Sequence, residues 1–248
     1  MTGFADHFSR SAPAYAAYRP SYPAPLISYI SSLCAARDLA WDAGTGSGQA
    51  AVRLAAHFTA VVATDASADQ IGHAQPHPTV TYRIAPEDQS GLASRSADLV
   101  TVAQALHWFD LPRFYREVRR VLKPGGVLAA WCYGRVRVDA AVDPIIDDFY
   151  ARRLAPFWPP ERRHVEAAYG DLPFPFDEIR PKPWVMKAPL TRPAFLGYLG
   201  TWSAVARARE SDGSDPLAEL ARQLADAWRD EDEPRIVTWP IGLRVGTR

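Results

Sequence analysis

A loop with three glycines is the part of the chain best suited to hold a ligand. Residues 42–48 read Asp-Ala-Gly-Thr-Gly-Ser-Gly, between a short apolar run and an alanine-rich segment. Glycines in such a loop permit a tight turn and let the backbone approach a ligand closely. The backbone N–H groups that open the following helix favour a carboxylate or a phosphate. The loop therefore predicts a binding site for a molecule that carries such a group.

An acidic residue after the loop supports this interpretation. Asp65 ends the next apolar run, where a carboxylate can accept hydrogen bonds from both hydroxyls of a ribose. A dinucleotide-binding fingerprint, G-x-G-x-x-G, would need a glycine at the position of Gln49. An NAD-linked oxidoreductase is therefore the weaker alternative for this loop.

A histidine and a tryptophan follow the fourth apolar run, at the expected mouth of the ligand cleft. His107 could orient an acceptor or remove its proton, and Trp108 lies beside it. The alternative is a histidine at a helix start that is hydrogen-bonded to the backbone. The six histidines are scattered, and no His or Cys cluster has metal-ligand spacing, so no metal site is predicted.

Strand and helix patterns alternate along residues 38–133. Apolar runs predict strands, and apolar residues at helical spacing predict helices. Strands are expected at 38–42, 60–64, 80–84, 97–103 and 127–133, and helices at 49–57, 66–73 and 111–122. Strands that are apolar on both faces and alternate with helices indicate an α/β, doubly wound parallel sheet covered on both sides.

The pattern after residue 133 is mainly helical. Helices are expected at 140–154, 162–169, 194–205 and 216–230, and strands at 184–187 and 235–245. We expect a single domain with an N-terminal cover at 1–37, a cofactor-binding core at 38–133, a helical insertion at 134–181 and C-terminal strands and helices at 182–248. Most of the 22 prolines lie outside residues 41–133. Because proline restricts the backbone, the segments that cover the cleft are expected to be short and stiff.

The overall composition excludes several classes of protein. The 28 basic and 28 acidic side chains cancel, which argues against a nucleic-acid binder. No run of apolar residues is long enough to span a membrane, and the first residues lack the apolar centre of a secretory signal. We expect a cytoplasmic protein that acts on a small molecule, with no obligate protein partner.

Several segments together resemble a known family. The form D-x-G-x-G-x-G at 42–48 is similar to motif I of class I S-adenosylmethionine-dependent methyltransferases. Further similarity is found at 84–88, 98–110, 117–126, 201–203 and 239–245, and in the leader around Phe8, Tyr15 and Tyr18. Within that class the chain resembles the subgroup of trans-aconitate methyltransferases. The resemblance implies a Rossmann-like, mostly parallel seven-stranded sheet with a helical insertion and an N-terminal helical cover.

The resemblance also implies roles for individual residues. The glycines would admit the methionine end and the ribose, Asp42 would hold the amino group through water, and Asp65 would bind the ribose hydroxyls. Either Glu87 or Asp88 would contact the adenine. Gln104 would face the methionine portion, Arg19 would meet its carboxylate, and aromatic rings could lie near the sulfonium. The complete cofactor-binding set is Tyr15, Tyr18, Arg19, Asp42, Gly44, Thr45, Gly46, Gly48, Asp65, Ala66, Glu87, Asp88 and Gln104, with His107 and Trp108 as catalytic residues.

The function expected from these residues is methyl transfer from S-adenosylmethionine to a small-molecule acceptor. A carboxylate oxygen is one candidate, because it is already ionised at pH 7 and needs no base. In that case His107 would only donate a hydrogen bond, whereas a phenol or an amine would make a base more valuable. A protein that binds S-adenosylmethionine without catalysis is a further alternative.

Overall fold

One mixed sheet organises the protein in the computed structural model, which describes residues 21–248. The strands lie in the order β3-β2-β1-β4-β5-β8-β6, and β7 also pairs with β8. The first five strands are parallel, whereas β8 is antiparallel to β5, β6 and β7. The strands are β1 Leu39–Ala43, β2 Ala60–Asp65, β3 Val80–Ile84, β4 Ala97–Ala103, β5 Leu122–Tyr133, β6 Asp177–Ile179, β7 Trp184–Leu190 and β8 Arg235–Thr247.

The eight strands fill seven positions. Ile241 on β8 pairs with Tyr133 on β5 and with Trp184 on β7, so β5 and β7 lie on opposite edges of β8. β6 pairs with the last three residues of β8, on the same side as β7. β6 and β7 therefore share one position, and the expected seven-stranded, mostly parallel sheet is confirmed.

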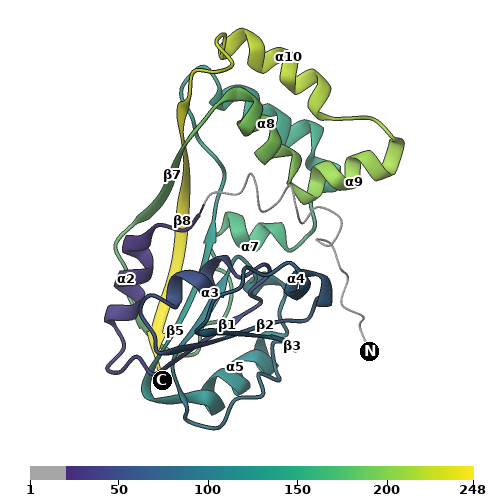
Figure 1. Cartoon of the computed structure of the whole chain (residues 1–248). Coiled ribbons are helices and arrows are strands. Elements are labelled where there is room, and N and C mark those ends of the chain that lie inside the picture. Colours follow the sequence, from purple (N-terminus) through teal and green to yellow (C-terminus); the bar gives the residue numbers. More distant parts are fainter. Residues whose placement is uncertain (1–20) are drawn as a thin grey trace.

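Helices cover both faces of the sheet (Figure 1). The side chains of β5 alternate between two apolar clusters, with Trp131 on one face and Cys132 on the other. Helices α2 and α3 pack on the first face, and α5 and α7 on the second. The helical elements are α2 Ala24–Ser32, α3 Gln49–Leu54, α4 Ala68–Gly72, η2 Leu106–Trp108, α5 Leu111–Val121, α6 Asp143–Asp148, η3 Phe149–Arg153, η4 Ala155–Phe157, α7 Arg162–Glu166, α8 Arg192–Gly200, α9 Ser203–Asp212 and α10 Leu217–Ala227.

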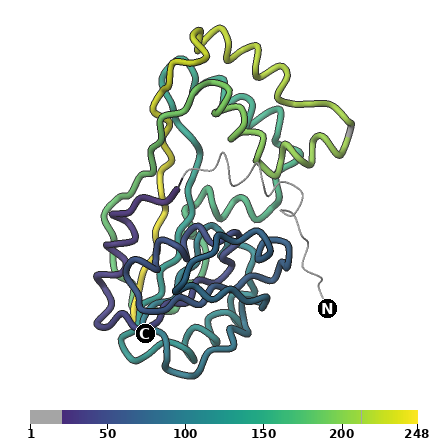
Figure 2. Tube along the Cα trace, viewed as in Figure 1, coloured from purple at the N-terminus to yellow at the C-terminus, as the bar shows by residue number. Residues whose placement is uncertain are grey.

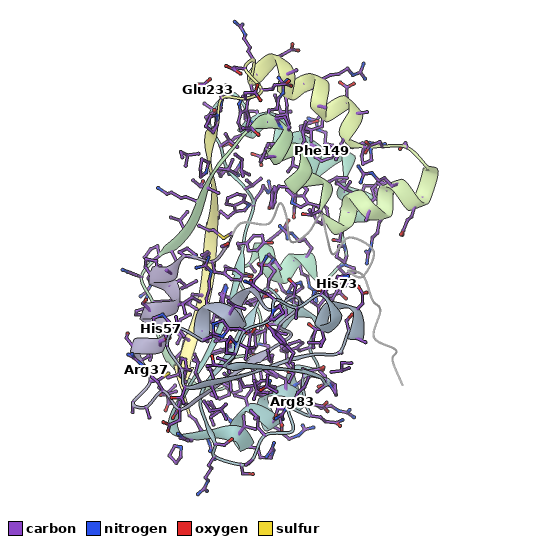
Figure 3. All side chains as sticks on the ribbon, in the orientation of Figure 1. Arg37, His57, His73, Arg83, Phe149 and Glu233 are labelled. Atoms are coloured by element: carbon purple, nitrogen blue, oxygen red, sulfur yellow. The ribbon has the colours of Figure 1, made fainter. Side chains whose placement is uncertain are left out.

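A helical cap stands beyond one end of the parallel strands. Figures 1 and 2 show α8, α9 and α10 at the far end of the long β7–β8 ladder. Phe149, labelled in Figure 3, lies in this cap, with its ring centroid 6.4 Å from that of Trp202. Trp202 and the fully buried Trp228 belong to the same apolar cluster as α3. The cap and the core of the molecule thus share one continuous apolar interior.

Four details differ from the sequence expectations. The helix expected at 194–205 is two helices, because the backbone at Trp202 is extended. The helix expected at 140–154 is α6 followed by a wider π-type turn, in which the N–H of Leu154 donates to the carbonyl of Phe149. The short strand β6 was not predicted. The strand expected from residue 127 begins at Leu122, directly after α5.

Candidate functional site

The glycine loop joins β1 to α3, as expected. Gly44, Gly46 and Gly48 all have left-handed backbone angles, with φ of 65°, 56° and 86°. A Cβ atom at Gly48 would lie 2.2 Å from the hydroxyl oxygen of Tyr82, so no side chain fits there. At Gly46 the nearest atom to such a Cβ would be the Gln70 side-chain oxygen, 3.6 Å away. One side of the loop is thus packed on the protein, and the side at Gly46 is open.

Asp65 ties the loop to the end of β2. Its carboxylate accepts hydrogen bonds from the N–H groups of Gly46, at 2.8 Å, and Ser67, at 2.9 Å. Asp65 is half-buried, and the next residue, Ala66, is exposed. These two donors fix the orientation of the carboxylate at the carboxyl end of β2.

Asp42 lies beneath the loop with no exposed surface. The hydroxyls of Thr45 and Thr101 each donate a 2.6 Å hydrogen bond to one of its two oxygens. Burial raises the pKa of Asp42 to about 6, although both hydroxyls lower it. The carboxylate therefore joins the loop to β4, and Thr101 is a member of the site that the sequence did not indicate.

Gln104 follows β4 in a left-handed conformation, with φ of 60°. Its N–H donates to the carbonyl of Trp131, and its side-chain oxygen accepts from the N–H of Tyr133, both at 2.8 Å. These two bonds fix Gln104 across the carboxyl ends of β4 and β5. It thus lies at the sheet edge where the sequence placed it, with its amide oxygen directed at β5.

The two predicted adenine contacts are both held near the start of α5. Glu87 accepts a 3.1 Å hydrogen bond from the N–H of Asp110. Asp88 lies 3.7 Å from a guanidinium nitrogen of Arg113. Both side chains follow β3, as expected. Which of the two contacts the adenine stays open.

His107 lies in the 3-10 turn η2, where its Nδ1 is 2.9 Å from the hydroxyl oxygen of Tyr169. Its ring centroid is 4.7 Å from that of Trp108. Burial, followed by the positive charges of Arg162 and His164, lowers the pKa of His107 to about 3. The imidazole is therefore neutral at pH 7, and its partner is a side chain rather than the backbone.

A basic pocket lies beside this turn and was not predicted. It has a volume of about 360 Å³. The Arg135 guanidinium lies 4.3 Å from the centre of the Tyr150 ring, and that of Arg162 lies 5.0 Å from the Trp158 ring. The residues that line the pocket include Arg135, Tyr150, Trp158, Arg162, Arg163 and Glu166. Its only sequence signal is the proline-dense stretch at 154–163.

The remaining sequence predictions concern the N-terminal leader, metal sites and membrane-spanning helices. Tyr15, Tyr18 and Arg19, with the leader motif around Phe8, lie outside the described residues. Within residues 21–248, no group of three His, Cys, Asp or Glu side chains could hold a metal ion. No helix in that part of the chain has the length and apolar character needed to cross a membrane.

The described residues fit S-adenosylmethionine. The open side at Gly46 allows the close backbone approach that motif I requires, and Asp65 stands at the end of the neighbouring strand. Ligands of open α/β sheets bind at the carboxyl ends of the strands, near the switch in strand order. That switch lies between β1 and β4 in this sheet. The glycine loop, Asp65 and Gln104 lie around this switch point.

Comparisons with known proteins identify the family of the chain. The methyltransferase domain family matches residues 41–130. A Dictyostelium discoideum protein assigned as a methyltransferase is 35% identical over 235 residues, which cover 93% of this chain and 89% of that protein. A Saccharomyces cerevisiae protein assigned as an S-adenosylmethionine-dependent methyltransferase is 31% identical over 124 residues, 46% of this chain and 43% of that protein.

A solved structure gives the same result for the fold. A protein of Anaeromyxobacter dehalogenans, assigned as a type II methyltransferase, superposes with a TM-score of 0.88 at 49% identity, over 93% of this chain and 98% of that one. Its similarity extends over the core and the cap alike, because so little of either chain is left out. The chain therefore belongs to the class I S-adenosylmethionine-dependent methyltransferases.

Proposed function

We propose that this methyltransferase acts on a carboxylate oxygen of a small molecule. The observation that carries the proposal is the neutral His107, whose pKa is lowered to about 3. Such a group is a poor base near neutral pH, since general-base efficiency needs a pKa near the working pH. A carboxylate acceptor needs no base, because it is already ionised. The resemblance to trans-aconitate methyltransferases supports the same acceptor class.

The basic pocket beside η2 supports an anionic acceptor. Its walls carry Arg135, Arg162 and Arg163 against one acidic residue, Glu166. Guanidinium groups bind carboxylates strongly through paired, charge-assisted hydrogen bonds. Helix α7, which carries Arg162 and Arg163, contacts η2, and the charge of Arg162 acts on His107. An acceptor held there would lie close to the carboxyl end of β4.

The cofactor would be held by the motif I loop, Asp65 and Gln104. When bound, S-adenosylmethionine supplies a methyl group on a sulfonium, and a carboxylate can receive it without losing a proton. The chain's own residues then have to orient the two partners and exclude water. We also propose a cytoplasmic location, which fits the free, buried thiols of Cys34 and Cys132.

The test starts with the cofactor. Calorimetry should show micromolar binding of S-adenosylmethionine and of its demethylated product. Asp65→Ala should weaken that binding at least tenfold, because one charge-assisted hydrogen bond contributes about 1.5–3 kcal/mol. Asp226→Asn, on an exposed part of α10, should leave it unchanged. Equal affinity of Asp65→Ala and the wild type would place the ribose elsewhere.

Acceptors are then tested as a panel. Mono-, di- and tricarboxylates are incubated with the protein and labelled cofactor beside phenols and amines, and methyl esters are identified by mass spectrometry. Ester formation is the expected result. Methylation of phenols or amines alone would overturn the carboxylate assignment, and cofactor binding without any transfer would favour a non-catalytic role. Binding of NADH in place of S-adenosylmethionine would favour the oxidoreductase alternative.

A further inference from the structure

An unusual turn follows helix α7. Ala168 and Tyr169 are consecutive non-glycine residues with left-handed backbones, with φ of 51° and 62°. Such conformations are strained for residues that carry a Cβ atom, and they persist only where the surrounding structure imposes them. Here Arg244 donates a 3.0 Å hydrogen bond to the Tyr169 carbonyl. Gly242 on β8 gives the turn space, since a Cβ there would lie 2.4 Å from that of Ala168.

The turn delivers the hydroxyl of Tyr169 to His107. Tyr169 is fully buried, and its oxygen lies 2.9 Å from Nδ1 of the histidine. The nearby backbone N–H groups of Leu106 and His107 lower the pKa of the Tyr169 phenol, against the larger effect of burial, which raises it. Because these backbone groups are donors and Nδ1 is the hydrogen-bond partner of the hydroxyl among residues 21–248, the hydroxyl hydrogen is directed at Nδ1. A neutral imidazole that accepts at Nδ1 carries its hydrogen on Nε2.

The second ring nitrogen is available for a ligand. Nε2 of His107 has no hydrogen-bond partner among residues 21–248. Building on the proposed function, we propose that Tyr169 is a positioning residue that fixes His107 as the Nε2–H tautomer, so that His107 donates a hydrogen bond to the acceptor carboxylate instead of removing a proton. This role gives a reason for the strained turn at Ala168 and Tyr169, because the turn brings the Tyr169 hydroxyl to the imidazole of His107.

The surrounding charges keep this arrangement constant with pH. Burial, followed by the coulombic effects of Arg162 and His164 on α7, holds the pKa of His107 at about 3. Cys132 on β5 and Tyr22 face Tyr169, whose pKa burial raises well above its usual range. Neither partner of the pair therefore changes its charge between pH 5 and pH 9, and the donor is present throughout.

Nitrogen NMR tests the tautomer without any acceptor. Long-range proton–nitrogen spectra of the histidine-labelled protein distinguish protonated from unprotonated ring nitrogens. We expect His107 to carry its proton on Nε2 with no titration from pH 5 to pH 9, and to become a mixture of tautomers in Tyr169→Phe. A matched control is Tyr115→Phe, which removes a buried hydroxyl donating to Pro173, also on the α5 side of the sheet. The control should keep the wild-type tautomer.

Three results would overturn the inference: an Nδ1–H tautomer in the wild type, a His107 that titrates near neutral pH, or an unchanged tautomer in Tyr169→Phe. If Tyr169→Phe does not fold, the inference is tested by the wild-type spectrum and by the kinetics of His107→Ala and His107→Gln. The NMR result also separates two failures. A wrong tautomer in a protein that still methylates carboxylates rejects only this inference, whereas the expected tautomer without carboxylate methylation rejects only the proposed acceptor.

Steady-state kinetics tests whether His107 donates a hydrogen bond to the acceptor during catalysis. His107→Ala should lower kcat/KM about 10- to 100-fold, the effect of one hydrogen bond to a charged group. His107→Gln, whose amide can place an N–H near the position of Nε2, should recover most of that loss. The wild-type kcat/KM should not fall between pH 8 and pH 6. A Gln variant as slow as the Ala variant, with a wild-type profile that falls on acidification, would show a base and overturn the donor role.

Discussion

At the scale of the residue, Asp42 opposes the stability of the chain. An acid with an ordinary pKa of 3.8 is held at about 6 because it is buried. Between those values the folded state keeps a proton that the unfolded state has released. The free energy of unfolding therefore falls as the pH rises from about 4 to about 6, and then stays level. The residue that fixes the binding loop thus lowers stability at neutral pH.

Because ionisation of Asp42 lowers the free energy of unfolding, we predict that Asp42→Asn stabilises the protein at neutral pH. An amide cannot ionise, and the hydroxyls of Thr45 and Thr101 can donate to it or accept from it. Relative to the wild type, the variant should gain about 2–2.5 kcal/mol between pH 4 and pH 7.5, most of the equivalent of the pKa difference of Asp42. Urea unfolding at both pH values measures it, with Asp226→Asn as the control. An equal difference between variant and wild type at both pH values would contradict the buried-acid account.

Single residues differed in how visible they were in the sequence. The loop glycines, Asp42 and Asp65 follow apolar runs at informative spacings, so their places were predictable. Tyr169 was not, because its contact with His107 joins positions 62 residues apart. Its neighbours carry no motif, and only the turn after α7 directs the hydroxyl to the imidazole. Thr101 was likewise hidden inside an apolar strand.

At the scale of the element, strands were predicted better than helices. Strands β1, β2 and β4 are buried on both faces, so their apolar runs nearly coincide with their bounds. The edge strand β3 is an exception in burial, with no fully buried residue. The break between α8 and α9 was missed, because it lies at one residue, Trp202, whose backbone is extended. Spacing alone does not reveal such a break.

The loop between β1 and α3 depends on β3 as much as on its own glycines. The Tyr82 hydroxyl donates a 2.8 Å hydrogen bond to the Gln75 carbonyl, which holds the ring beside Gly48. We predict that Gly48→Ala lowers the free energy of unfolding by about 1–3 kcal/mol, the usual cost of a strained backbone, and weakens S-adenosylmethionine binding. The loop must move either the Tyr82 ring or the start of α3 to admit the methyl group.

A second glycine provides the control for this prediction. Gly72 ends α4 without a left-handed backbone, and a Cβ there would meet no atom within 4 Å. Gly72→Ala should therefore leave the stability unchanged or raise it by up to about 1 kcal/mol. Chemical unfolding and calorimetric titration of both variants decide the matter. If the two substitutions had the same effect, the packing of Tyr82 against the loop would not be what requires Gly48.

At the scale of the whole molecule, the cap is an extension of the sheet. β8 pairs with β5 through its last seven residues and with β7 through its first seven. Trp228 in the cap and Leu54 on α3 belong to one apolar cluster. Within residues 21–248, one apolar cluster therefore includes residues of both the cap and the cofactor-binding core. This continuity favours the single domain that the sequence suggested.

Unfolding should accordingly be one cooperative transition. Scanning calorimetry should give equal calorimetric and van't Hoff enthalpies, and cofactor at 100 times its Kd should add about 2.7 kcal/mol to the whole transition. Trp228→Ala, at a fully buried cap position, should cost about 3–5 kcal/mol and move that same transition. Ile236→Ala, at a position 55% exposed on β8, should change stability by less than about 0.5 kcal/mol. Two resolved transitions, of which only one responds to cofactor and the other to Trp228→Ala, would show instead that cap and core fold separately.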